Sequence, residues 1–229
     1  MPADAFEFII SQQANGTCAI CSANIDGFGM RKIQLPGDPD YKGITVEQAI
    51  VNRRSHRDFS GQAMSLAELS HLLLYSSGIT DKRHGFRAAP SAGATYPIKV
   101  HALVNNVNGL AKGLYLYLIP SHELELMHEG DFSHDLSHAA LGEKMVRHAN
   151  VVLALSAVFQ RTQRRYRERA QRYIFFEAGH IAQNAYLVAT SMGLGACAIG
   201  AFYDDEVNRL LGLNIRDESA LYLIVVGKI

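Results

Sequence analysis

The spacing of apolar and polar positions predicts two helices near the start of the regular part of the chain. Thr45 and Gln48 match a capping box, and the apolar positions that follow continue a helix toward Arg53. A serine capping box at residues 65–68 opens a second helix with a leucine stripe. Gly78 is placed where a helix-ending glycine is expected.

The period then changes from helical spacing to two. Residues 97–104, 114–119 and 123–127 alternate between apolar and polar side chains, and turn-forming residues separate the first two, which indicates an antiparallel meander or hairpin. Residues 131–149 return to a helical pattern. The continuous apolar run at 150–159 is typical of a strand buried on both faces.

The last third of the chain mixes the two periods. We expect a long helix from about 171 to 192, ended by Gly193, and a short apolar strand at 196–202. A short helix at 204–213 and a buried strand at 220–227 follow. Helices and strands do not alternate strictly, so the pattern favours a single α+β domain over a doubly wound sheet.

Residues 1–43 differ from the rest, because they are rich in turn-forming residues and show no sustained period. We predict an irregular N-terminal arm at 1–43 and one regular domain at 44–229. The arm contains Cys18 and Cys21 in a C-x-x-C arrangement, but zinc would require two further ligands. A thiol redox pair and two free thiols remain the alternatives, and no metal site is predicted.

Composition narrows the class of protein. The chain has 229 residues, 48% of them apolar, and 22 basic residues balance 22 acidic ones. This is globular composition without a field that would attract nucleic acid or an acidic membrane. No apolar run reaches the length of a membrane span, no secretory signal is recognisable, and three cysteines do not form a disulfide framework. We therefore expect a cytoplasmic protein without nucleic-acid or membrane partners.

Three stretches carry candidate chemistry, and each also has an ordinary structural explanation. In "RRSHRDFS" (53–60) the arginines either complement the dipole of a helix end or, with Ser55 between them, bind a phosphate. In "RAAPSAGATYP" (87–97) the small residues either form a plain loop or let the backbone approach a flat ligand.

The third stretch is "FFEAGHIAQNAYLVATSMGLGACAIGAF" at 175–202. Its polar residues need partners if they are buried: Glu177, His180, Gln183 and Asn184. The segment is either a core helix or a helix at a subunit interface beside a cofactor. Its "GLG" follows a helix instead of a strand, so a nicotinamide-binding Rossmann domain is not predicted.

In this order and spacing, the three stretches and the closing "VVG" resemble the flavin-dependent nitroreductase superfamily, and within it the SagB-type (thiazole/oxazole-like) dehydrogenases, over residues 44–229. The resemblance implies an α+β, three-layer fold with a central, mainly antiparallel sheet flanked by helices. It also implies an intertwined homodimer that binds FMN at its interface, with contacts from both chains.

The resemblance implies a role for each matching segment. The basic–serine–basic element holds the FMN phosphate and reaches the pyrimidine end of the ring, with Arg54 acting through its backbone. The small-residue loop lies against the isoalloxazine, backbone N–H groups at 199–201 face flavin N5 and O4, and Lys228 reaches the phosphate. The FMN-binding residues implied in this way are Arg53, Arg54, Ser55, Arg57, Pro90, Ser91, Ala92, Gly93, Ile199, Gly200, Ala201 and Lys228.

The basic run at 161–172 contains six arginines and one glutamate. A solvated helix face and a nucleic-acid patch are the alternatives from the residues alone, and overall neutrality disfavours the second. The azoline-oxidising relatives carry a lysine–tyrosine pair implicated in catalysis here, and Arg165 and Tyr166 correspond to it. Because arginine is a poor proton acceptor, Tyr166 is the candidate catalytic residue that remains.

As a whole, the resemblance implies an FMN-dependent oxidoreductase that transfers hydride through flavin N5 between NAD(P)H and a small organic substrate. Two alternatives stay open. One is an azoline (thiazoline or oxazoline) dehydrogenase that acts on a ribosomal peptide. The other is a flavin-binding module without turnover.

Overall fold

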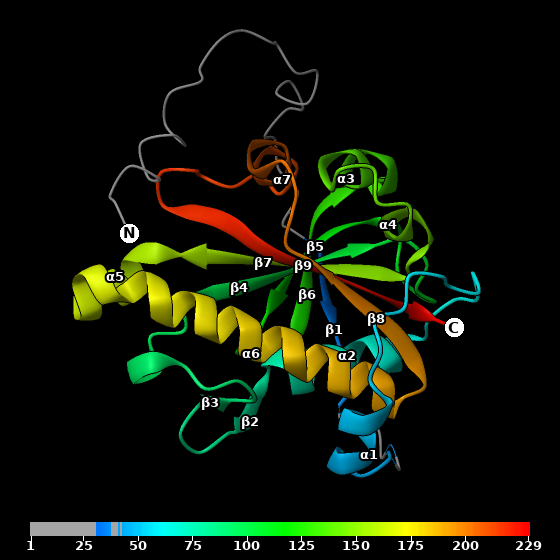
Figure 1. Ribbon diagram of the computed structural model, residues 1–229, viewed down its shortest axis with the longest axis horizontal. Helices are drawn as coiled ribbons and strands as arrows, with labels where there is room; N and C mark the ends of the chain where they lie inside the picture. Colours follow the sequence, from blue (N-terminus) through cyan, green and yellow to red (C-terminus); the bar gives the residue numbers. More distant parts are fainter. Residues whose placement is uncertain (1–30, 38–40, 42) are drawn as a thin grey trace, which may run out of the picture.

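The protein is built around one seven-stranded sheet in which every strand pairing is antiparallel (Figure 1). The computed structural model describes residues 31–37, 41 and 43–229. In sheet order the strands are β1 (Lys32–Gln34), β6 (Glu123–Glu129), β5 (Gly113–Leu118), β4 (Ile98–Val104), β7 (Val151–Val158), β9 (Glu218–Lys228) and β8 (Leu194–Ile199).

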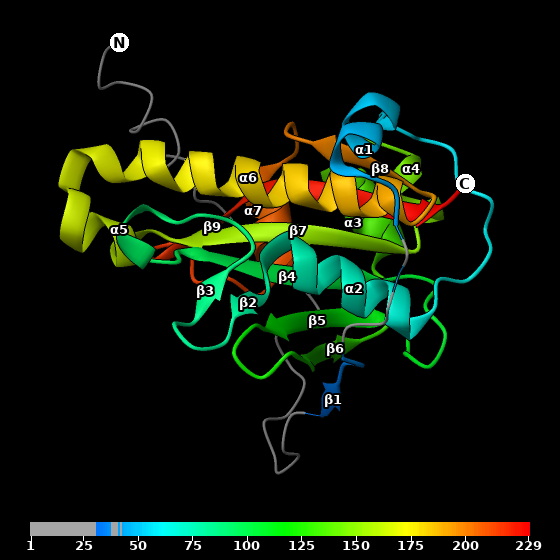
Figure 2. The ribbon, with the colours of Figure 1, turned by 90° about the horizontal axis from the view of Figure 1, so that it is seen from below.

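Helices cover both faces of this sheet and complete three layers (Figure 1). The long α6 (Ala170–Ser191) crosses one face beside α2 (Leu66–Ser77), with α1 (Val46–Asn52) against its C-terminal half (Figure 2). α5 (Phe159–Tyr166) enters α6 through a 3-10 turn, η4 (Arg167–Arg169). The other face carries α3 (Ser133–Ala139), α4 (Met145–His148) and α7 (Asp204–Leu210). The predicted α+β class and its mainly antiparallel central sheet are confirmed.

The apolar pattern explains the two cores. In β7, Val151, Leu153 and Leu155 join the cluster under α6 and α2, whereas Val152 and Ala154 join the cluster under α3, α4 and α7. Successive side chains of a strand point to opposite faces. The continuous apolar run at 150–159 is therefore a strand buried on both sides, as predicted.

Local signals place most helix ends correctly. Both capping boxes are present, since the Thr45 side chain accepts from Gln48 N and the Ser65 side chain accepts from Glu68 N. α1 ends at Asn52 with Arg53 as its C-cap. No helix in the described residues is long and apolar enough to cross a membrane.

The prediction of one helix over 131–149 is wrong, because the structure has two short helices there, α3 and α4. Leu141 and Gly142 between them adopt positive φ of 57° and 82°, and a helix cannot continue through such residues. Gly142 N instead closes α3 by donating to Ser137 O at 2.8 Å. The strand predicted at 196–202 begins two residues earlier and ends at Ile199, which leaves Gly200 and Ala201 outside the sheet.

Two further elements escaped the sequence patterns. The segment at 1–43 contains the three-residue strand β1, which pairs with β6, and the neighbouring Leu35 is buried in the core. A small two-stranded sheet of β2 (Ile79–Asp81) and β3 (Phe86–Arg87) precedes the small-residue loop. Cys18 and Cys21 lie outside the described residues, and Cys197 is buried in β8.

Candidate functional site

The segment after α1, residues 53–60, lies along the outer edge of the sheet and is called the arginine loop below. Ser55 forms an isolated parallel bridge with Ala196 of β8, and His56 N donates to Ala196 O at 2.9 Å. Further on, Ser60 N donates to Lys228 O at 2.9 Å. Backbone contacts therefore fix both ends of the arginine loop on strands β8 and β9.

Tyr186 of α6 connects the arginine loop to the end of β8. Its hydroxyl lies 3.2 Å from Ser55 Oγ and accepts from Ala198 N at 2.6 Å. The Arg53 guanidinium lies over its ring, 5.3 Å from the centroid. Because Ala198 directly precedes the 199–201 segment, the structure brings together two elements that the resemblance assigns to FMN.

Tyr186 was missed by the sequence analysis, which placed it inside a helix without a role. The available signal was chemical: a tyrosine within an apolar helix needs a partner for its hydroxyl once it is partly buried. Two adjacent elements supply that partner here.

The arginines of the loop divide into two kinds. Arg54 Nη1 donates to Val51 O and Arg53 O, both at 2.8 Å, so it caps α1 as the helix-dipole alternative predicted. Arg53 is partly buried and Arg57 is exposed, and within the described residues no carboxylate pairs with either guanidinium. These two guanidiniums and Ser55 are available for an anion.

The segment after β8 offers backbone donors. Ile199 is 6% exposed, whereas Gly200 and Ala201 are exposed. In the part of the chain that the structure describes, the N–H groups of these two exposed residues donate to no backbone acceptor. They can donate to a bound molecule.

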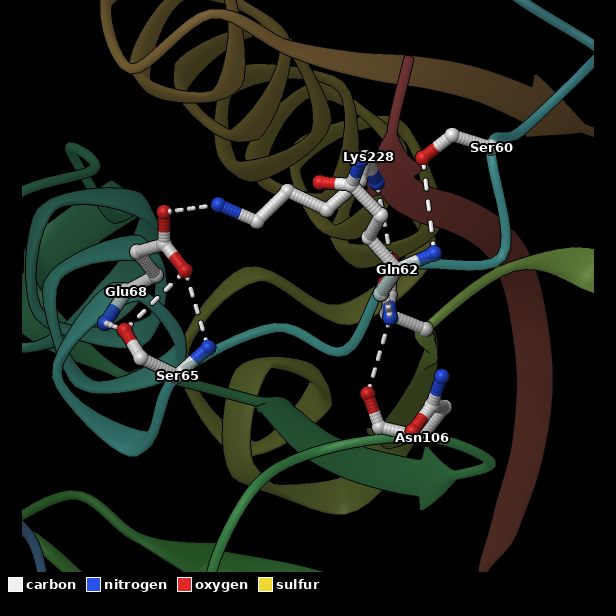
Figure 3. Close-up of polar contacts among 7 residues, drawn as sticks. Ser60, Gln62, Ser65, Glu68, Asn106 and Lys228 are labelled. Carbon is white, nitrogen blue, oxygen red and sulfur yellow. Dashed lines mark hydrogen bonds and ion pairs between the residues drawn. The ribbon is translucent and has the colours of Figure 1, made fainter.

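Lys228, the predicted phosphate contact, has a partner within the chain (Figure 3). Its Nζ donates to Glu68 Oε1, and the other oxygen of Glu68 accepts from Ser65 N at 2.8 Å in the capping box of α2. Its backbone N donates to Asn150 Oδ1 at 2.8 Å. Lys228 thus ties the end of β9 to α2.

The second part of the candidate site, residues 90–97, is called the glycine loop below. It contains a 3-10 turn, η3 (Ala92–Ala94), and three residues with positive φ: Gly93 at 58°, Ala94 at 52° and Tyr96 at 44°. Left-handed backbone is uncommon for residues other than glycine. Such conformations persist where surrounding structure fixes them.

Helix α5 supplies much of this fixation. Arg161 Nη1 donates to Tyr96 O at 2.9 Å, and Arg165 Nη1 donates to Gly93 O at 3.1 Å. The hydroxyls of Thr95 and Thr162 lie 2.9 Å apart. Two arginines of the basic run therefore bind the backbone of the glycine loop. Neither of the two alternatives, a solvated helix face or a nucleic-acid patch, predicted this contact.

Tyr166, the candidate catalytic residue, lies against the same loop. A Cβ built on Gly93 would lie 2.7 Å from Tyr166 Oη and 2.7 Å from Arg165 Nη1. The Tyr166 ring also packs edge-on against Tyr173, with 4.8 Å between the centroids. Gly93 thus permits a close approach that a side chain would prevent.

Glu177 of α6 is buried beneath the glycine loop, 3% exposed. Burial raises the pKa of its carboxyl to about 7, although hydrogen bonds from the Ser91 hydroxyl and Ile98 N and the charge of Arg87 act in the opposite direction. The Arg87 guanidinium itself stacks over the Tyr96 ring, 4.2 Å from the centroid.

The other polar residues of the same helix behave differently. His180 and Gln183 are exposed. Asn184 Nδ2 donates to Ser76 O at 3.4 Å. The expectation that buried polar groups need partners therefore applies chiefly to Glu177 and Asn184.

The two parts of the candidate site contact different halves of α6. Glu177 lies near the glycine loop and Tyr186 contacts the arginine loop, and the two residues are nine positions apart, roughly 13 Å along the helix axis. Among the described residues, no hydrogen bond joins one loop to the other.

The Nitroreductase family model matches residues 50–228 of this chain. The chain belongs to the nitroreductase family. The matched range includes the arginine loop, the glycine loop and Tyr186, so the predicted resemblance is confirmed.

Relatives in sequence extend this finding. A protein of Methanocaldococcus jannaschii, provisionally named a nitroreductase, is 41% identical over 197 residues, which cover 86% of this chain and 96% of that protein. The trifolitoxin operon protein TfxC of Rhizobium leguminosarum bv. trifolii is 25% identical over 80% of this chain. The microcin B17-processing protein McbC of Escherichia coli is 27% identical over 72% of it. The matches span 55% and 63% of the last two proteins.

Solved structures agree on the fold. A provisionally named nitroreductase from Ralstonia eutropha superimposes with a TM-score of 0.75 at 28% identity, covering 89% of this chain and 95% of that one. One from Anabaena variabilis gives a TM-score of 0.77 at 28% identity, covering 90% of this chain and 45% of that one. The three-layer nitroreductase fold is thereby confirmed.

Proposed function

We propose that this protein is an FMN-dependent oxidoreductase that passes hydride between NAD(P)H and a small organic substrate. The observation that carries the proposal is the junction at Tyr186, where Ser55 and the strand before residues 199–201 share one hydroxyl. The Ser55 hydroxyl and the exposed N–H groups of Gly200 and Ala201 are thus held near one another. The phosphate of FMN can accept from the hydroxyl, and the heteroatoms of its ring can accept from the N–H groups.

The donor set fits this cofactor. Arg53, Ser55 and Arg57 supply guanidinium and hydroxyl donors, which suit a phosphate. Exposed N–H groups at Gly200 and Ala201 suit the polar edge of an aromatic ring. When bound, FMN supplies hydride transfer, and the protein's part is to bind and orient it.

The glycine loop belongs to the same proposal through a second copy of the chain. The two loops are separated along α6. Helices α1 and α6 lie on the same side of the sheet (Figure 2), and both carry exposed apolar side chains. A homodimer that buries them would bring one chain's glycine loop to the other chain's arginine loop. The residues concerned are Val46 (65% exposed), Ile50 (55%), Val51 (67%), Phe175 (49%) and Phe176 (55%).

Purification tests the cofactor and the dimer together. The protein should be yellow, or become so with FMN, and should elute as a dimer. Val51→Asp combined with Phe176→Asp should give a monomer with weaker flavin retention. A protein that stays colourless after incubation with FMN contradicts the proposal.

Turnover separates an enzyme from a flavin-binding module. The holoprotein should oxidise NADH or NADPH when a quinone or nitroaromatic acceptor is present. Bound flavin without any oxidation of either nucleotide would favour the non-catalytic module.

An azoline dehydrogenase is the second candidate function. It is supported by the similarity to the microcin B17-processing protein McbC and by the place of Tyr166 beside the glycine loop. Arg165 disfavours it, because its guanidinium is engaged with Gly93 O and is a poor base. A thiazoline-containing peptide offered to the wild type and to Arg165→Lys tests this function, and oxidation only in the variant would identify Arg165 as the obstacle.

A further inference from the structure

Helix α5 contacts the glycine loop from three positions, and one of them is buried. Arg161 and Arg165 donate to carbonyl groups of the loop at 2.9 and 3.1 Å, but both side chains are exposed, so water competes for these contacts. Thr162 lies between them in the sequence and is 1% exposed. Its hydroxyl lies 2.9 Å from the hydroxyl of Thr95. This pair of hydroxyls is the contact between helix and loop from which water is excluded.

The neighbouring hydrogen bonds set the direction of this contact. Thr95 Oγ1 donates to Ala92 O at 3.0 Å, across the 3-10 turn η3. A hydroxyl has one hydrogen and two lone pairs, so Thr95 has no second hydrogen to give. Thr162 is therefore the donor to Thr95. The hydrogen bonds run from α5 through the Thr95 hydroxyl to the backbone of η3.

Thr162 has no alternative partner for its hydroxyl among the residues that the structure describes. A threonine inside a helix often donates back to the carbonyl group four residues earlier, but the bond from Thr162 leaves the helix instead. Loss of the acceptor on Thr95 would leave a buried hydroxyl unsatisfied, which costs more than an exposed hydrogen bond contributes. The packed helix consequently favours the loop conformation in which Thr95 reaches it.

The turn restrained in this way contains strained backbone. Gly93 and Ala94, the two residues between Ala92 and Thr95, have φ of 58° and 52°. Left-handed conformations persist where the surrounding structure determines them. The hydrogen bonds from Thr162 fix both sides of this pair, Thr95 through its hydroxyl and Ala92 through its carbonyl group. The strained residues are thus held from α5.

We propose that Thr162 is a positioning residue for the FMN site: by donating to Thr95 it holds η3 in the conformation that the glycine loop presents to the flavin. The inference rests on the proposed function. Thr162 does not need to touch the flavin or the substrate. Without the bond the loop populates other conformations, and the apparent affinity for FMN falls in proportion to the fraction of molecules that remain competent.

Titration with FMN, followed by quenching of flavin fluorescence, compares the wild type with two variants of Thr162. Valine keeps the shape of threonine without its hydroxyl, whereas serine keeps the hydroxyl. We expect Thr162→Val to bind FMN about fivefold more weakly, as for the loss of one buried hydrogen bond. Thr162→Ser should restore the affinity to within about twofold of the wild type.

Ser137→Ala is the control, because it also removes a buried hydroxyl. Ser137 lies in α3 on the opposite face of the sheet, and its Oγ donates to Glu143 O at 3.0 Å. The melting temperature should fall in this variant as it does in Thr162→Val, but FMN affinity should stay at the wild-type value. An equal loss of affinity in both variants would mean that lower stability alone weakens FMN binding, and would overturn the inference.

A double variant tests whether Thr162 acts through Thr95. Thr95→Val removes the acceptor and leaves the Thr162 hydroxyl without a partner. Thr162→Val should then cost no further affinity, so the double variant should bind FMN at least as tightly as Thr95→Val alone. A further fivefold loss in the double variant would show that Thr162 acts by another route, and this result also overturns the inference.

Hydrogen exchange in the apo-protein gives a readout without flavin. The backbone N–H groups of Thr95 and Tyr96 both donate within the loop. They should exchange faster in Thr162→Val than in Thr162→Ser or Ser137→Ala. A wild type that binds no FMN would defeat the proposed function, and this measurement would still decide whether Thr162 fixes the loop.

The remaining outcomes concern a wild type that does bind FMN. Wild-type affinity and exchange in a folded Thr162→Val overturn the inference, and so does a Thr162→Ser variant that binds no better than Thr162→Val. Should Thr162→Val not fold, Thr95→Val takes its place, because Thr95 is only half-buried and lies outside the helix. Unchanged FMN affinity in Thr95→Val then overturns the inference.

Discussion

The arginine loop and the glycine loop are built in opposite ways. In the arginine loop the backbone is fixed on β8 and β9, and the side chains of Arg53 and Arg57 are free of ion pairs among the described residues. In the glycine loop the backbone is strained and partly exposed, and side chains of α5 donate to its carbonyl groups. One loop offers side chains to a ligand, and the other offers backbone and a close approach.

This difference teaches which substitutions damage each loop. Removal of a side chain should affect the arginine loop most, because its backbone remains held. Addition of a side chain should affect the glycine loop most, because its function depends on the absence of Cβ atoms. The predictions below follow from this contrast, in order of decreasing effect.

Gly93→Val should cause the largest loss. The residue has φ of 58°, and its Cβ would meet Arg165 and Tyr166. Left-handed backbone costs about 1–2 kcal/mol, and displacement of two side chains adds to it, so FMN affinity should fall about 30-fold or more. Titration with FMN measures this effect.

Gly212→Val is the matched control, because Gly212 has a similar φ of 66° and no atom within 4 Å of an added Cβ. It lies just after α7 on the other face of the sheet. Thermal unfolding should show a loss of stability in both variants, and a larger one in Gly93→Val because two side chains are displaced there. Equal loss of FMN affinity in both would mean that the glycine loop has no special role.

Arg53→Ala should lower FMN affinity about 10-fold or more, since a hydrogen bond from a charged donor contributes about 1.5–3 kcal/mol. Arg54→Ala is its control, because the Arg54 side chain caps α1 and does not face a ligand. That variant should lose stability and keep its affinity. If Arg54→Ala lost affinity and Arg53→Ala kept it, Arg54 and not Arg53 would be the arginine that binds FMN.

Tyr186→Phe sharpens the contrast within the arginine loop. It keeps the ring under Arg53 and removes the hydroxyl shared by Ser55 and Ala198 N. We expect a loss of about 1 kcal/mol, seen as roughly fivefold weaker FMN binding and a lower melting temperature. Unchanged affinity would show that Ser55 is held by β8 alone.

Lys228→Met should have the smallest effect on FMN, within about twofold, because its ammonium is bound to Glu68. The effect should appear in stability instead. Burial alone would raise the pKa of Glu68, but hydrogen bonds from Lys228 and Ser65 lower it overall. This contribution is present above the ordinary carboxyl pKa and is lost as the pH falls through the folded value. Urea unfolding at pH 3 and pH 7 should therefore show a smaller pH effect in the variant.

Much of the fold follows from the sequence, because its signals are local. Capping boxes at Thr45 and Ser65 and the alternating strands depend on neighbouring residues only. The break at Leu141 was not predictable from the apolar period, which continues across it. β1 is three residues long and acquires its conformation only by pairing with β6, 90 residues later.

The candidate site divides in the same way. Spacing and resemblance identified the arginine and glycine loops, and the prediction of their residues as FMN contacts stays a prediction. Tyr186 and Arg161 were missed, because their roles depend on contacts with residues far away in sequence. Glu177 was recognised as a polar group that needs partners once buried, but its place near the glycine loop could not be identified without the fold.

The bridge between Ser55 and Ala196 has a consequence for solubility. β8 is the last strand of the sheet, and a bare outer strand is a template for pairing with another chain. The arginine loop covers that strand. His56 packs closely on it, because a Cβ added to Gly195 would lie 2.7 Å from the Cβ of His56. Displacement of the loop would uncover the strand, so we expect the arginines to be in place before any cofactor arrives and their release to promote aggregation.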